Sequence, residues 1–176
     1  MQIKKTTPLG AEVSDIDLSN VLTESDHNLI KEAFLDNLVL IFKNQKLTPQ
    51  NLLMAASVWG SPQQHPVFKG LEEHPEIIKI ENFGAKYHTN AHWHSDVTFE
   101  KEPPDATILY AIDVPSAGGN TLFANQYLAY DSLEDQLKEK LDSIKEEIKP
   151  KANEEGFEDL AKRFLKEGME GFRLGK

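Results

Sequence analysis

The stretch on which the rest of the chain depends is Asn90-Ala91-His92-Trp93-His94-Ser95-Asp96-Val97-Thr98-Phe99. Within it, His94 and Asp96 form an H-x-D pair. In an extended segment, side chains two residues apart point to the same side, so an imidazole and a carboxylate would converge here. Such a pair is two thirds of the 2-His-1-carboxylate set that holds non-heme Fe(II) and leaves coordination positions open. A hydrogen-bonded surface pair is the other interpretation of an isolated H-x-D.

A third protein ligand is harder to find in the sequence. His92 would share the face of His94, but four strand residues separate it from Asp96, a span of roughly 13 Å that is too long for one ion. The six histidines all lie at or before the motif, at positions 27, 65, 74, 88, 92 and 94. A metal site of another kind, as in cupins, would need His88 or His92 to lie close to His94.

Composition narrows the class of protein. The chain has 176 residues, 39% of them hydrophobic and 27% charged, which suits one soluble domain with a real core. The net charge of −10 argues against a nucleic-acid partner, and the absence of cysteine excludes disulfides and zinc–thiolate sites. No apolar run reaches membrane-spanning length and no signal peptide begins the sequence, so we expect a cytoplasmic protein without a membrane partner.

The first part of the chain alternates helix and strand signals. We predict an edge strand or extended arm within 11–18, a helix capped by Thr23, a buried strand at 38–42, and a second helix from Thr48-Pro49 to Gly60. Further strands are predicted at 76–80, 106–112 and 121–123, the second being the best in the sequence. After residue 131 half of the residues are charged, and apolar residues at helical spacing predict two amphipathic helices, over 133–148 and 157–164.

Two motifs together point to a known family. Trp93 precedes His94-Ser95-Asp96, giving W-H-x-D, and Gly118-Gly119-Asn120-Thr121 follows as G-G-x-T. Both resemble the TauD/TfdA family of Fe(II)- and 2-oxoglutarate-dependent dioxygenases. The resemblance covers residues 1–142, which we assign to the N-terminal part of a dioxygenase domain; 143–176 is a charged helical tail without a counterpart. It implies an α+β fold with a double-stranded β-helix (jelly-roll) core, incomplete here, with N-terminal helices and a helical C-terminal tail.

The resemblance also implies roles for individual residues. His94 and Asp96 match the family's iron ligands, and Thr121 matches the threonine that helps to hold 2-oxoglutarate. His65 and Asn90 match residues that contact the sulfonate in taurine-type enzymes, and Phe68 replaces a tyrosine there, which weakens the case for taurine itself. No catalytic side chain beyond these is assigned.

The family also uses a distal histidine as third iron ligand and an arginine that pairs with 2-oxoglutarate. Neither has a counterpart here, since no histidine follows His94 and the only arginines are Arg163 and Arg173. Three explanations stay open: the gene is truncated, another chain supplies the missing half, or the product is a non-catalytic remnant.

Two functions therefore compete. One is a dioxygenase that uses Fe(II), 2-oxoglutarate and O₂ to hydroxylate a small anionic substrate such as an alkylsulfonate or a taurine-like compound. The other is a non-catalytic assembly or interaction module. Half a jelly roll would expose an apolar face. We therefore expect the tail helices to cover that face, or a homo-oligomer or second chain to bury it.

Overall fold

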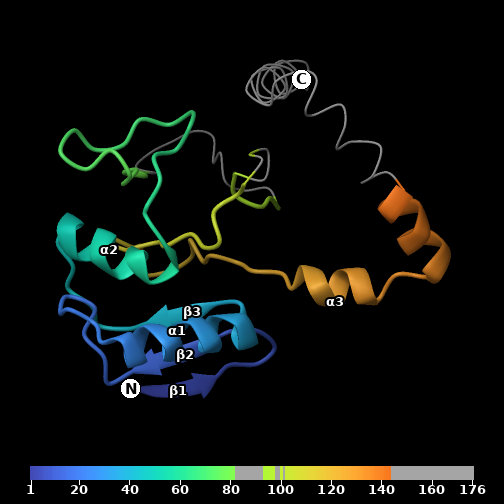
Figure 1. Ribbon diagram of the computed structural model, residues 1–176, viewed down its shortest axis with the longest axis horizontal. Helices are drawn as coiled ribbons and strands as arrows, with labels where there is room; N and C mark the ends of the chain where they lie inside the picture. Colours follow the sequence, from blue (N-terminus) through green and yellow to red (C-terminus); the bar gives the residue numbers. More distant parts are fainter. Residues whose placement is uncertain (82–92, 98–99, 101, 144–176) are drawn as a thin grey trace. The chain divides into compact units, whose positions relative to one another are not determined.

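The computed structural model describes residues 1–81, 93–97, 100 and 102–143 (Figure 1). These residues fall into two compact units. The first comprises 1–81, 93–94 and 104–125, and the second 95–97, 100, 102–103 and 126–143. Each unit is described by itself.

A three-stranded sheet begins the first unit. Its strands are β1 (Gln2–Lys5), β2 (Ala11–Ser14) and β3 (Leu40–Phe42), in the order β1-β2-β3. β1 pairs with β2 antiparallel, Ile3 opposite Val13, and β2 pairs with β3 parallel, Val13 opposite Phe42. The strand expected within 11–18 is therefore central rather than at an edge, because β1, which the sequence analysis missed, covers its other side.

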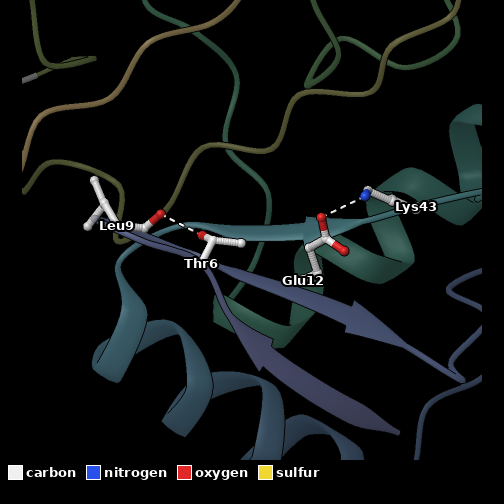
Figure 2. A network of polar contacts seen from close by, with 4 residues as sticks. All are labelled: Thr6, Leu9, Glu12 and Lys43. Carbon is white, nitrogen blue, oxygen red and sulfur yellow. Dashed lines mark hydrogen bonds and ion pairs between the residues drawn. The ribbon is translucent and has the colours of Figure 1, made fainter.

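Polar contacts hold the ends of these strands together (Figure 2). The Thr6 hydroxyl donates to the carbonyl of Leu9 over 2.7 Å and closes the connection between β1 and β2. On the outward face of the sheet, Lys43 donates to the carboxylate of Glu12 over 2.6 Å, which lowers the pKa of Glu12 from its usual 4.5. The parallel pair of β2 and β3 is thus joined by side chains as well as by the backbone ladder.

Helix α1 (Glu24–Asn37) follows from its capping sequence. The Thr23 side chain accepts from the backbone N–H of Asp26 over 3.1 Å, and the Asp26 carboxylate accepts from the backbone N–H of Thr23 over 3.0 Å. Two of the four free N–H groups of the first turn are satisfied in this way. The helix ends at Leu38, whose φ of 66° is left-handed, so Leu38 is a cap rather than the first residue of the predicted strand.

Helix α2 (Pro49–Ala56) begins with the same type of N-terminal cap as α1. Thr48 caps it with Asn51 in a capping box, Pro49 occupies its first turn, and a single 3-10 turn, η1 (Ser57–Trp59), carries the chain to Gly60. The prediction of a helix from Thr48-Pro49 to Gly60 is confirmed. Phe34 of α1 meets Trp59 edge to face, with ring centroids 5.5 Å apart, and so packs the two helical segments together.

The core of the described structure lies entirely in this N-terminal part. Its buried apolar side chains are Ala11, Val13, Leu18, Ile30, Ala33, Ala55 and Val58. They come from β2, α1 and the α2–η1 segment, together with Leu18 in the connection between β2 and α1. Ile41 in β3 is 42% exposed, so the run predicted as a buried strand is only partly covered. Among residues 61–143, none that the structure describes is fully buried.

Three predicted strands are wrong. Residues 76–80 begin in a turn, where the N–H of Leu71 donates to the carbonyl of Ile77 and the N–H of Ile77 to that of His74. Residues 106–112 and 121–123 have no regular secondary structure. β-prone residues become a strand only when a neighbouring strand supplies the backbone hydrogen bonds. None of the described residues supplies them here. The jelly-roll core therefore stays a prediction.

The second unit contains helical segments. α3 (Gln126–Asp131) was missed by the sequence analysis, and residues 135–143 are helical, as predicted within 133–148. The Tyr130 hydroxyl donates to the carboxylate of Asp142 over 3.1 Å, which raises the pKa of Tyr130 above 10.0. Lys138 donates to the carbonyl of Asp131 over 3.0 Å. The helix predicted over 157–164 lies outside the described residues, and no described helix has the length and apolar character to cross a bilayer.

Candidate functional site

The two predicted iron ligands are assigned to different units. His94 is the last motif residue of the first unit, and Asp96 belongs to the second. Both side chains are exposed. Only one residue separates them in the sequence. However, Asp96 and Val97 lie in a turn, and not in the extended segment that was predicted. Strand geometry therefore does not place the Asp96 carboxylate on the same side as the His94 ring.

Strained backbone marks the residue after Asp96. Val97 has a φ of 53°, and its carbonyl accepts from the N–H of Glu100 over 3.1 Å to close the turn. A β-branched residue at positive φ is a genuine outlier, costing of order 1–3 kcal/mol, and such outliers concentrate at functional sites. This signal of function was not available from the sequence.

The described residues do not assemble a full metal-ligand set. No group of three or more His, Cys, Asp or Glu side chains suited to a metal ion occurs within 1–81, 93–97, 100 and 102–143. His94 and Asp96 are donors of the right chemical type, but two donors are one short of the facial triad. His88 and His92 lie outside the described residues, so the cupin-like alternative stays untested.

His65 and Phe68 are brought together by a turn in the first unit. The Nδ1 atom of His65 accepts from the backbone N–H groups of Val67, over 3.0 Å, and Phe68, over 3.1 Å. The two rings lie 4.8 Å apart between centroids. An Nδ1 that accepts two hydrogen bonds carries no proton, so the geometry assigns the proton of the neutral ring to Nε2. His65 thus has one N–H left as a donor to an anion.

Thr121 lies after a turn that only glycine can make easily. Gly118 and Gly119 have φ values of 77° and 67°, both left-handed. A Cβ on Gly119 would also lie 3.1 Å from the Cγ of Pro115. The G-G of the motif is therefore explained by backbone geometry. Thr121 itself is exposed, and Asn90, the third predicted substrate residue, lies outside the described residues.

A polar junction that the sequence analysis missed links three segments of the first unit. The Gln45 side chain accepts from the N–H of Leu18 over 2.8 Å and donates to the carbonyls of Ile16 and Lys43, each over 3.1 Å. The Tyr110 hydroxyl accepts from the N–H of Leu47 over 3.1 Å and lies 3.4 Å from the Gln45 carbonyl. The local sequence around Gln45 and Tyr110 does not predict a contact between residues more than sixty positions apart.

Comparison with known proteins gives a consistent result. A sequence model of the family described as taurine catabolism dioxygenase TauD, TfdA matches residues 2–169, which extends past the boundary expected at 142. An alkylsulfatase of Acinetobacter baylyi is 34% identical over 142 residues, covering 79% of this chain and 44% of that protein. An alpha-ketoglutarate-dependent sulfate ester dioxygenase of Pseudomonas putida is 31% identical, covering 77% and 45%.

Solved structures agree with the sequence relatives. The crystal structure of a taurine dioxygenase from Burkholderia xenovorans superposes with a TM-score of 0.69 at 34% identity, over 80% of this chain and 50% of that one. The chain therefore spans about half the length of the relatives that it matches.

Proposed function

Because the chain belongs to the TauD, TfdA family, we propose that it forms the metal-binding half of a 2-oxoglutarate-dependent dioxygenase. The observation that supports this best is the family match, which includes His94-Ser95-Asp96 and Gly118-Gly119-Asn120-Thr121. Relatives named for sulfate esters and sulfonates support a small organic anion as the substrate. The proposed reaction is hydroxylation of that anion with Fe(II), 2-oxoglutarate and O₂.

The residues fit iron only in part. His94 and Asp96 are the proposed protein ligands, and the described residues offer no third donor for the same ion. Bound iron would supply the activation of O₂, and we assign no reaction step to this chain alone. Thr121 is the proposed donor to a carboxylate of 2-oxoglutarate, a role that its hydroxyl can fill.

The turn at His65 is the proposed substrate contact, together with Asn90. Its Nε2–H is free of the two backbone contacts that occupy Nδ1, so it can donate to a sulfonate or sulfate oxygen. Phe68, 59% exposed and in contact with the His65 ring, offers an apolar wall without a hydroxyl. Phe68 lacks the hydroxyl of the tyrosine that it replaces, which weakens the case for taurine, and its apolar ring suits an anion with an alkyl chain.

Anaerobic titration with Fe(II) in the presence of 2-oxoglutarate tests the proposal. The chelated complex has a weak visible charge-transfer band, and we expect that band for the wild-type chain and its loss in His94→Ala. His27→Ala, on α1, is the matched control and should keep the band. A wild-type chain without the band, and with the same iron affinity as His94→Ala, would contradict the proposal for this chain.

A non-catalytic assembly module is the second candidate function. It is favoured by the exposed apolar residues of the segment after Pro104, and by the lack of a third metal ligand within the part of the chain that the structure describes. The same titration separates the two, because an assembly module has no need for iron. Cytoplasmic location is part of the first proposal, since 2-oxoglutarate and Fe(II) are available there.

A further inference from the structure

A small cavity lies between helix α2 and the loop that follows it, within the first unit. Its volume is about 300 Å³, at the lower end of the range for small-molecule sites. The described residues that line it are Gln50, Leu53, Met54, Pro62 and Glu76. None of these belongs to the residues proposed above as contacts of iron, 2-oxoglutarate or substrate. The proposed function therefore leaves this cavity unexplained.

Three apolar side chains form the walls of the cavity. Leu53 and Met54 follow Gln50 by three and four positions, so α2 presents all three on one face. Pro62 lines the cavity from the loop. Leu53, Met54 and Pro62 are each half-buried, so part of their apolar surface is open to an occupant. Such walls favour a ligand with an alkyl part, because burying apolar surface stabilises the bound state.

Glu76 brings a carboxylate to the cavity from a hydrogen-bonded turn. On one side of it, the backbone N–H of Ile77 donates to the carbonyl of His74 over 3.0 Å. On the other side, Pro75 lies so close to Gly70 that a Cβ on Gly70 would overlap the Pro75 carbonyl. The backbone on both sides of Glu76 is thus held in place before any ligand binds.

Among the described residues, none pairs with the Glu76 carboxylate by a hydrogen bond or an ion pair. Glu76 is half-buried, and a partly desolvated carboxylate gains from a cation that also donates hydrogen bonds. None of the described lining residues is basic, and the net charge of −10 attracts cations and repels anions. The charge of the cavity therefore suits a cationic ligand.

The N-terminus of α2 has few N–H groups to offer an anion. Free N–H groups at the start of a helix attract anions. Here Pro49 has no N–H, and the N–H groups of Asn51 and Leu52 donate to Thr48 over 3.2 and 3.0 Å. The Gln50 side chain is exposed, and its amide oxygen can accept from a ligand. Both polar side chains of the lining can therefore accept hydrogen bonds.

We propose that this cavity is a binding site for a small alkylammonium ion. The ammonium group donates hydrogen bonds to the Glu76 carboxylate and the Gln50 amide oxygen. The alkyl chain lies against the three apolar walls. The carboxylate selects the cation over an alcohol of the same length, and the walls select an alkyl chain over a bare inorganic cation. This site goes beyond the proposed function and does not depend on it.

A titration of the full 176-residue chain with n-butylammonium chloride in about 0.15 M salt tests the site, followed by NMR of the backbone amides. We expect saturable shifts at the amides of Leu53, Met54 and Ile77. n-Butanol has the same alkyl chain without the charge and should bind at least about fivefold more weakly, because charge-assisted hydrogen bonds are the stronger ones. Methylammonium should also bind more weakly, by roughly twofold for each methylene removed.

Matched variants assign the charge to Glu76. Glu76→Gln keeps the shape of the side chain and removes its charge, so it should weaken butylammonium binding at least about fivefold. Glu73→Gln removes an exposed carboxylate of the same loop that does not line the cavity, and should leave the affinity unchanged. Circular dichroism verifies that both variants fold. If Glu76→Gln does not fold, the comparison of butylammonium with butanol on the wild-type chain still decides the proposal.

Three kinds of result would overturn the proposal. The absence of saturable shifts with butylammonium would mean that the cavity is no such site. Equal affinities for butylammonium and butanol, or for the wild type and Glu76→Gln, would mean that the carboxylate does not bind the ammonium group. Equal affinities for methylammonium and butylammonium would mean that the apolar walls take no part. None of these results depends on iron, so failure here and failure of the Fe(II) titration are distinguishable.

Discussion

Two apolar runs of the same character have different outcomes in this molecule. Leu38-Val39-Leu40-Ile41-Phe42 contains β3, whereas Ala106-Thr107-Ile108-Leu109-Tyr110-Ala111-Ile112 has no regular structure. The first run has β2 beside it in parallel register, and the N–H of Ala11 donates to the carbonyl of Val39 over 2.9 Å. The second has no strand beside it among the described residues. The comparison shows that β-propensity is realised only where a partner strand exists.

The largest effect is expected in the region that contains β3, where the apolar run does form a strand. Ile30 is 1% exposed on α1, which packs on β3, so Ile30→Ala removes apolar contacts and leaves a cavity. We expect a loss of about 3 kcal/mol in the free energy of unfolding, measured with urea. Leu35→Ala, 75% exposed on the same helix, is the control and should change it by less than about 0.5 kcal/mol. Equal losses in the two variants would mean that the burial of Ile30 does not stabilise the fold.

The next largest effect on stability is expected at the polar junction formed by Gln45 and Tyr110. Gln45→Ala removes three hydrogen bonds to backbone groups of residues 16, 18 and 43. We expect the free energy of unfolding to fall by about 2 kcal/mol, because partly buried backbone groups lose their partners. Gln50→Ala, at an exposed position in α2, removes the same side chain as a control. A thermal melt of both variants decides the matter, and indistinguishable melting temperatures would refute the role of Gln45.

A smaller effect is expected in the second apolar run, residues 106–112, where one hydroxyl links the run to the rest of the unit. Tyr110→Phe deletes the hydroxyl that accepts from the N–H of Leu47 and keeps the ring. We expect a loss of about 1 kcal/mol, seen as roughly fivefold faster hydrogen exchange at the Leu47 amide. The N-terminal core should melt as in the wild type, since no core residue contacts the lost hydroxyl by a hydrogen bond. Unchanged exchange would mean that the segment is held to the unit by other contacts.

The smallest effect is on the pH dependence of stability. Hydrogen bonds from Thr23 lower the pKa of Asp26 from its usual 3.8. Between the folded-state pKa and 3.8 the unfolded chain binds more protons than the folded one, so the contribution of Asp26 is present above pH 3.8 and is lost as the pH falls through the folded-state pKa. We expect Asp26→Asn to lower the melting temperature near neutral pH and to narrow its difference from the wild type in acid.

A matched control for the Asp26 variant is Asp36→Asn, which removes an exposed carboxylate from the other end of α1 and leaves the cap intact. Melting curves between pH 6 and pH 2 provide the measurement. If Asp26→Asn stays parallel to the wild type over the whole range, the capping carboxylate does not couple folding to protonation.

Much of the N-terminal part was predictable because its signals are local. Thr23 and Thr48 cap helices by contacts three residues along the chain, and Pro49 fits a first turn by its fixed φ. The family, too, followed from short motifs around His94 and Thr121. The sequence alone therefore determined both helices, the run that contains β3 and the family of the protein.

Other features were decided by tertiary structure, because they depend on partners distant in sequence. β2 is central only because β1 pairs with it, and Tyr110 meets Leu47 across 63 positions. The proton of His65 is assigned to Nε2 by two backbone N–H groups that no motif announces. Residues 106–112 have the composition of a strand but lack a neighbour among the described residues. Composition supplies the propensity, and only the packed chain supplies the hydrogen-bond partners that turn it into structure.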